Sequence, residues 1–150
     1  MEDLIYSPVF IAYAKCVVIL AVKMSFTAWT TVAIMISSDG KGMRNQEDLL
    51  KGPANPNPNP DQLKPYEPAE KQRRIMGHDL ENNVPFFAVG LIYCLLNAGN
   101  EVPLYAYTGM KCVHHLAYWS GQRHEVRATF WTITNYSFLY MAWLVWKKLG

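Results

Sequence analysis

The residues best suited to take part in chemistry lie just before and inside an apolar stretch near the middle of the chain. Arg74, His78 and Glu81 are spaced four and then three residues apart, so in a helix they share one face. Pro85 continues that face and has no N–H, which leaves the Glu81 carbonyl without its usual helical donor. We therefore expect ionisable groups in the first turns of an otherwise apolar helix.

Further polar residues occur toward both ends of the chain. His114 and Tyr118 are four residues apart and also share a helix face, while Arg127 opens the last apolar stretch. Lys23 lies in the middle of the first apolar stretch. Ionisable side chains cost about 2.5–3.5 kcal/mol each to insert into lipid, so we expect them to face protein and neutralise one another.

The balance of charge among these residues indicates what they could bind. Arg74, Arg127 and Lys23 outnumber the acids Asp79 and Glu81. A cavity with excess positive charge favours an anionic ligand, and it would lower the pKa of a bound thiol from about 8.5 and so favour the thiolate. The pattern therefore predicts a site for an anionic ligand.

Each residue also has a simpler structural explanation. Arg74 and Arg127 could contact lipid headgroups, and Glu81 could form a structural ion pair with Lys23. The histidines could hydrogen-bond within a helical bundle. We expect no metal site, because the Glu-x-x-His pattern of di-metal bundles is absent from the sequence.

Four apolar stretches must position these residues. A spanning helix needs about 20 mostly apolar residues; the first and fourth stretches reach that length alone, the second needs its polar lead-in, and the third is marginal. We expect one all-α domain over residues 1–150, an integral membrane four-helix bundle. The expected spans cover about 9–37, 70–97, 102–120 and 127–147.

A polar linker over about 38–69 joins the first two expected spans. Its "NPNPNP" run cannot lie inside a helix, because each proline lacks a donor and clashes with the preceding turn. We expect an extended, solvated spacer. Within the linker, "NQEDLLKG" predicts a short helical turn with Asn45 as its cap and Gly52 as its stop.

The distribution of lysine and arginine predicts an orientation in the membrane. The linker and the third loop are rich in basic residues, whereas the amino terminus and the second loop contain none. We therefore expect the linker and the third loop to be cytoplasmic and both termini to lie on the opposite side. Nucleic-acid binding is not expected, because the net charge is only +2 and no binding motif is present.

Together these motifs resemble those of the MAPEG family, the membrane-associated proteins in eicosanoid and glutathione metabolism. "RR" followed by "HDLENNVPF" resembles the family's Arg-Ala-His-x-Asn-Asp-x-Glu-Asn motif, and "NQED" resembles its Asn-Pro-Glu-Asp. "VHHLAY" resembles its His-x-x-x-Tyr, and "VRA" resembles the opening of its fourth helix. The match covers nearly the whole chain in order. Within the family, the chain looks similar to microsomal glutathione transferase and membrane prostaglandin E synthase.

The resemblance implies a homotrimer that binds glutathione, its co-substrate, between neighbouring subunits at the cytoplasmic side. Glu81 would hold the glutathione amino group, and Arg127 would be the catalytic residue that stabilises the thiolate. Asp48 matches a first-loop acid that lies near the site in some members. The implied glutathione-binding residues are Arg74, His78, Glu81, His114, Tyr118 and Arg127.

The chain departs from the family pattern at several positions. His78 stands where the family has asparagine, Gly77 replaces a larger or polar residue, and Ser37 stands where many members have arginine. A lost charge-assisted contact of about 1.5–3 kcal/mol would weaken glutathione binding roughly 10-fold to 100-fold unless His78 compensates. Ala128 and Trp131 replace a serine and a tyrosine of the prostaglandin synthases, which points away from prostaglandin synthesis.

Two functions are therefore predicted. The first is a membrane glutathione transferase or peroxidase that acts on lipophilic electrophiles or lipid hydroperoxides, in the endoplasmic reticulum or a mitochondrial membrane. The departures motivate an alternative, a non-catalytic MAPEG-like accessory subunit of a larger membrane complex. The expected partners are membrane lipid and either identical subunits or, under the alternative, other membrane subunits.

Overall fold

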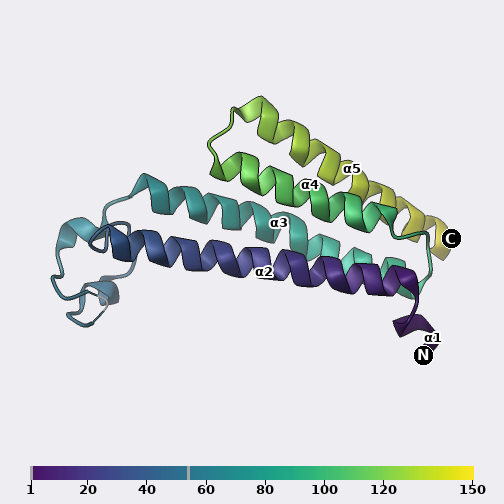
Figure 1. Cartoon of the computed structure of the whole chain (residues 1–150), viewed down its shortest axis with the longest axis horizontal. Helices are drawn as coiled ribbons and strands as arrows, with labels where there is room; N and C mark the ends of the chain where they lie inside the picture. The colour runs from purple at the N-terminus through teal and green to yellow at the C-terminus, as the bar shows by residue number, and fades with distance from the viewer. Residues whose placement is uncertain (1, 54) are drawn as a thin grey trace. The chain divides into compact units, whose positions relative to one another are not determined.

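The computed structural model describes residues 2–53 and 55–150; residue 54, inside the expected linker, lies outside the described part. Over these residues the protein is all-α and contains no strand, which confirms the expected fold class (Figure 1). Short 3-10 turns, η1 and η2, occur in the linker. The elements are α1 (Glu2–Ile5), α2 (Pro8–Ser37), η1 (Gln46–Leu49), η2 (Pro60–Leu63), α3 (Glu67–Leu95), α4 (Val102–Trp119) and α5 (His124–Leu149).

The chain divides into two compact units, which we describe separately. Unit 1 comprises Met1–Lys23 and Asp79–Gly150, and unit 2 comprises Met24–His78. The helices α2 and α3 each contribute residues to both units.

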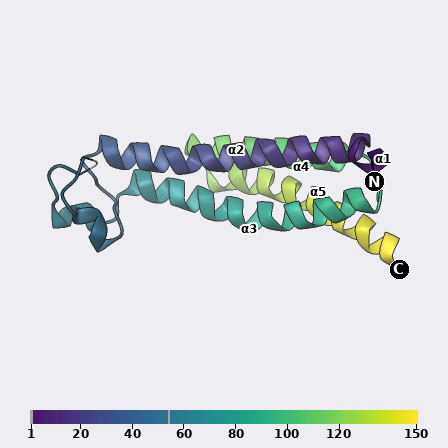
Figure 2. The same cartoon turned by 90° about the horizontal axis from the view of Figure 1, so that it is seen from below.

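Unit 1 is a helical bundle. In it, α4 and α5 lie side by side and run antiparallel after a short loop in which Gly121 adopts a φ of +75° (Figure 2). The first part of α2 and the second part of α3 complete the bundle. Its buried apolar side chains come from all four helices: Val9, Ala12, Cys16, Leu20, Phe86, Tyr93, Cys94, Leu104, Tyr107, Met141 and Val145.

Aromatic contacts hold α3 against its neighbours in unit 1. The Phe86 ring stacks on that of Tyr107 of α4, with 4.0 Å between centroids and 4° between planes. The Tyr107 hydroxyl donates to the Asn82 carbonyl at 2.8 Å. On the α2 side, the Tyr13 hydroxyl donates to the Phe87 carbonyl at 2.8 Å. These contacts link neighbouring helices through backbone carbonyls next to Pro85.

Among the helices of the described residues, α2 is the one that is long and apolar enough by composition to cross a membrane. The other expected spans, at about 70–97, 102–120 and 127–147, stay predictions. In α5, tyrosines, tryptophans, threonines and Asn135 interrupt the apolar residues. Such residues reduce mean hydropathy without introducing charge.

The linker in unit 2 contains the predicted short turn after Asn45. The Asp48 carboxylate accepts a hydrogen bond from the backbone N–H of Asn45 at 3.2 Å, so η1 starts directly after Asn45 and ends before Gly52. Downstream, Pro60 occupies the first turn of η2, where its fixed φ suits a helix start. The Asn59 side chain accepts from the Asp61 N–H at 2.9 Å.

The rest of the linker is more folded than the spacer that we expected. Gln62 is buried, and its amide nitrogen donates to the Asp39 carbonyl at 2.6 Å. Its amide oxygen accepts from the Asn59 N–H at 3.0 Å and from the Asn55 side chain at 2.8 Å. Residues 56–60 of the proline-rich run are exposed, as expected, but the linker is not a free extended spacer, because the buried Gln62 amide gives its backbone internal hydrogen-bond partners.

Candidate functional site

In unit 1, the end of α4 and the start of α5 bring three predicted site residues together. The guanidinium carbon of Arg127 lies 4.3 Å from the centroid of the Tyr118 ring. The Tyr118 ring meets the His114 ring edge to face, with 6.1 Å between centroids. His114 is buried and Tyr118 is partly buried. The antiparallel turn between the helices produces this contact, because the first turn of α5 follows directly on the last turn of α4.

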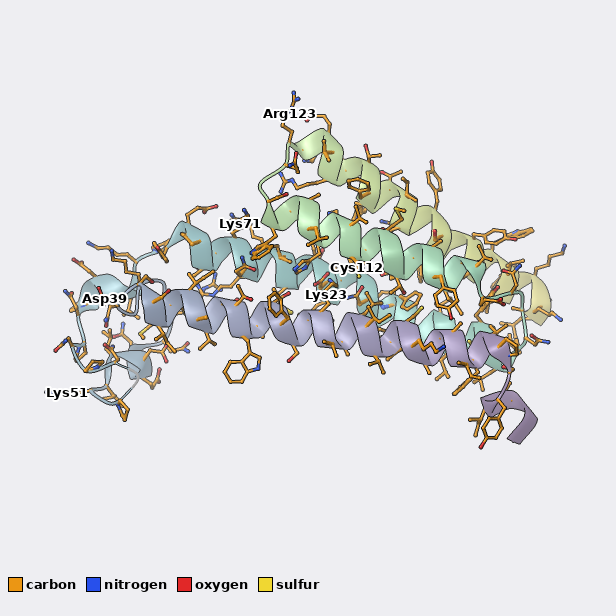
Figure 3. The ribbon with its side chains drawn as sticks, in the orientation of Figure 1. Lys23, Asp39, Lys51, Lys71, Cys112 and Arg123 are labelled. Atoms are coloured by element: carbon orange, nitrogen blue, oxygen red, sulfur yellow. The ribbon has the colours of Figure 1, made fainter. Side chains whose placement is uncertain are left out.

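Arg127 has a property that suits a ligand-binding residue. Its Nε atom is buried and has no hydrogen-bond partner among the described residues. Stacking on an aromatic ring uses the face of a guanidinium and leaves its N–H donors free to bind an anion. By contrast, Arg123, which precedes α5, is exposed and points away from the helices (Figure 3).

Glu81 lies on the part of α3 that belongs to unit 1, and it is exposed at the surface of the single chain. Lys23, which we considered as its structural partner, forms an ion pair with Asp79 at 2.5 Å from Nζ to Oδ2. The structure therefore gives the Lys23 charge a partner in Asp79.

Three further predicted residues belong to unit 2. Arg74 forms an exposed ion pair with Glu67, two turns earlier on α3, at 2.5 Å. His78 is partly buried at the end of the unit. Asp48 belongs to η1, where its carboxylate caps the turn, so this residue has a local structural role in the linker.

A buried charged cluster in unit 1 was not predicted as a whole. The Asp79 side chain is 3% exposed and contacts Lys23 of α2. Its oxygens also lie 3.8 Å from Lys111 Nζ and 3.8 Å from His115 Nδ1 of α4. Lys111, which the prediction missed, and His115, which we had considered only as a hydrogen-bonding histidine of the bundle, are four residues apart on α4. The available signal was a lysine inside the third apolar stretch.

Two other features of the described residues bear on the kind of site present. No group of three His, Cys, Asp or Glu side chains in the described part of the chain is placed to hold a metal ion. A cavity of about 370 Å³ lies in unit 2, where Lys41, Gln62 and Tyr66 are among its lining residues. None of the predicted site residues lines this cavity.

Comparison with known proteins bears on the identity of the chain. The MAPEG family model matches residues 13–146, a range that includes every predicted site residue. Microsomal glutathione S-transferase 1 from Sus scrofa is 29% identical over 121 residues, which cover 79% of this chain and 76% of that protein. Because the family match spans most of the sequence, the chain belongs to the MAPEG family of integral membrane proteins.

Proposed function

We propose that this protein is a membrane glutathione transferase, with peroxidase activity as the related reaction. The observation that carries the proposal is the buried Arg127 Nε, which has no hydrogen-bond partner in the described structure and lies on a guanidinium stacked over Tyr118. Family membership and the match to a glutathione S-transferase support a glutathione-related membrane function.

In the proposed mechanism, Arg127 donates to the sulfur of glutathione and stabilises its thiolate. A nearby cation lowers a thiol pKa from its usual value of about 8.5, so more thiolate is present at neutral pH. The thiolate forms a carbon–sulfur bond with a lipophilic electrophile, and the leaving group departs with its electron pair. With a lipid hydroperoxide, two glutathiones are oxidised to the disulfide while the hydroperoxide is reduced to alcohol and water.

The remaining contacts are assigned by resemblance. We assign Glu81 to the glutathione amino group and Arg74 to one of its carboxylates. His78, His114 and Tyr118 are assigned to the other polar groups of the tripeptide. A carboxylate and a cation can together orient a zwitterionic ligand, because each selects the opposite charge.

The cellular setting also belongs to the proposal. We place the linker and the third loop in the cytoplasm, where glutathione is abundant, and the chain in the endoplasmic reticulum or a mitochondrial membrane. We also propose a homotrimer. The exposed position of Glu81 supports it, because a carboxylate at the surface of one subunit is accessible to a neighbour.

Calorimetry of the purified protein in detergent tests the proposal. Titration with glutathione should give heat that saturates at millimolar ligand or below, and the same preparation should conjugate glutathione to chlorodinitrobenzene. An absence of heat at millimolar glutathione would contradict the proposal. If other membrane chains then co-purified with the protein, the non-catalytic accessory subunit would be the better description.

A further inference from the structure

We infer that Asp79 and Lys111 are positioning residues for the proposed glutathione site. They hold α3 in register with α4 and thereby place Glu81 relative to His114 and Tyr118. The inference rests on the proposed function, but it concerns residues that touch no ligand themselves. All five residues belong to unit 1.

These two side chains face each other inside the bundle. The Lys111 side chain is 1% exposed and the Asp79 side chain 3% exposed, and the resemblance assigns neither of them to glutathione. We therefore expect them to act on glutathione through the helices that carry them. Figure 3 marks Lys23 on α2 and Cys112, the residue that follows Lys111 on α4.

The cluster joins three helices through one carboxylate. The Lys23 Nζ of α2 lies 2.5 Å from Oδ2 of Asp79 on α3. From α4, the Lys111 ammonium and the His115 ring each approach the Asp79 carboxylate at 3.8 Å. Attraction between charges in a low-dielectric interior is strong and depends on distance, so it opposes sliding of one helix along another.

The spacing along each helix connects this cluster to the proposed site. Glu81 lies two residues after Asp79, and His114 lies three residues after Lys111. A helix rises about 1.5 Å per residue, so a slip of one residue between α3 and α4 would move Glu81 by that distance. A displacement of about 1 Å in a binding geometry can reduce activity by roughly 100-fold.

A second contact between the same helices keeps them packed when the cluster is altered. The Phe86–Tyr107 stack and the hydrogen bond from Tyr107 to the Asn82 carbonyl contain no charge. Variants of the cluster should therefore fold, with α3 and α4 joined but less strictly aligned. The Tyr107 hydroxyl also provides a matched control at this interface.

The test uses the full chain in detergent and three variants: Lys111→Met, Lys111→Arg and Tyr107→Phe. Two quantities are measured for each, the glutathione Kd by calorimetry and the Tm without ligand. Methionine fills similar space without charge, but removing one partner of a buried ion pair is destabilising, because it leaves the other charge less compensated. Lys111→Met should therefore lower the Tm and raise the Kd by about 10-fold or more.

The other two variants separate positioning from general packing. Lys111→Arg restores a cation opposite Asp79, so its Kd should stay within about threefold of wild type. Tyr107→Phe should lower the Tm and leave the Kd nearly unchanged, because it removes a hydrogen bond without disturbing the charge cluster.

Three outcomes would overturn the inference. If the wild-type protein binds glutathione and Lys111→Met binds it with equal affinity, the positioning role alone is rejected. A wild-type protein that does not bind glutathione would reject the proposed function and the inference with it. An equal loss of affinity in Tyr107→Phe would also reject the positioning role, since any weakening of the interface would then suffice.

Discussion

At the scale of single residues, the strongest chemical feature is a cation that has a buried N–H donor without a hydrogen-bond partner. Arg127 stacks on Tyr118 while its buried Nε finds no partner in the described structure. A buried donor without a partner usually costs about 1–3 kcal/mol, so a ligand that accepts from it recovers a substantial free energy. The orphaned donor therefore favours a binding role for Arg127 over contact with lipid headgroups alone.

Replacing Arg127 by alanine should reduce activity sharply. We expect Arg127→Ala to lower kcat/KM for chlorodinitrobenzene conjugation by roughly 100-fold, the size of effect seen when one electrostatic stabiliser is removed. Arg123→Ala is the matched control, because Arg123 is exposed four residues earlier in the same segment. Unchanged activity in Arg127→Ala would refute the mechanism.

At the scale of elements, glycine allows α2 and α3 to pack closely within unit 1. A Cβ added at Gly90 would lie 3.0 Å from Cε2 of the Tyr13 ring. That ring cannot move away freely, because its hydroxyl is hydrogen-bonded to the Phe87 carbonyl. Gly109 of α4, by contrast, has open space around the same position.

The two glycines should respond oppositely to the same substitution. Gly90→Ala should destabilise the protein by about 1–3 kcal/mol, since it overpacks a helix contact. Gly109→Ala should stabilise it by about 0.5–1 kcal/mol, because alanine favours a helix interior. The Tm of each variant in detergent checks this prediction, which fails if both variants shift in the same direction.

The linker depends on one buried amide in a similar way. Gln62→Leu keeps the side-chain size but removes the partners of the Asp39 carbonyl and the Asn59 N–H. Each of these hydrogen bonds contributes about 0.5–1.5 kcal/mol, so without them the linker should open more often. Limited proteolysis should then cut residues 38–66 at least about 10-fold faster than in wild type.

Gln46→Leu supplies the comparison for this experiment, because Gln46 is exposed in η1. Its cleavage rate should match that of wild type. Equal protection of the linker in Gln62→Leu would show that the amide does not hold the proline-rich backbone in place.

At the scale of the whole molecule, the sequence belongs to a membrane family, and its proposed ligand should stabilise the folded chain. Glutathione at about 100 times its Kd should add about 2.7 kcal/mol to the free energy of unfolding, because it binds the native state. The Tm should therefore rise with glutathione. Sodium glutamate at equal concentration should leave the Tm unchanged, and an equal rise with both would indicate a general anion effect.

By itself, the sequence determined the helical class, the family and the residues that could take part in chemistry. These follow from local information: apolar stretches of helical length, a capped turn after Asn45, and polar residues at spacings of three and four. The pairing of His114 with Tyr118 was predictable for the same reason, since both lie on one helix face.

Only the tertiary structure decided which charges meet. Sequence spacing relates residues within one helix, but the partner of Lys23 depends on how α2, α3 and α4 pack in unit 1, and the structure pairs it with Asp79. The same limit hid Lys111, whose charge is balanced across a helix interface. The folded linker was missed because Gln62 bonds to a backbone carbonyl 23 residues earlier in the chain.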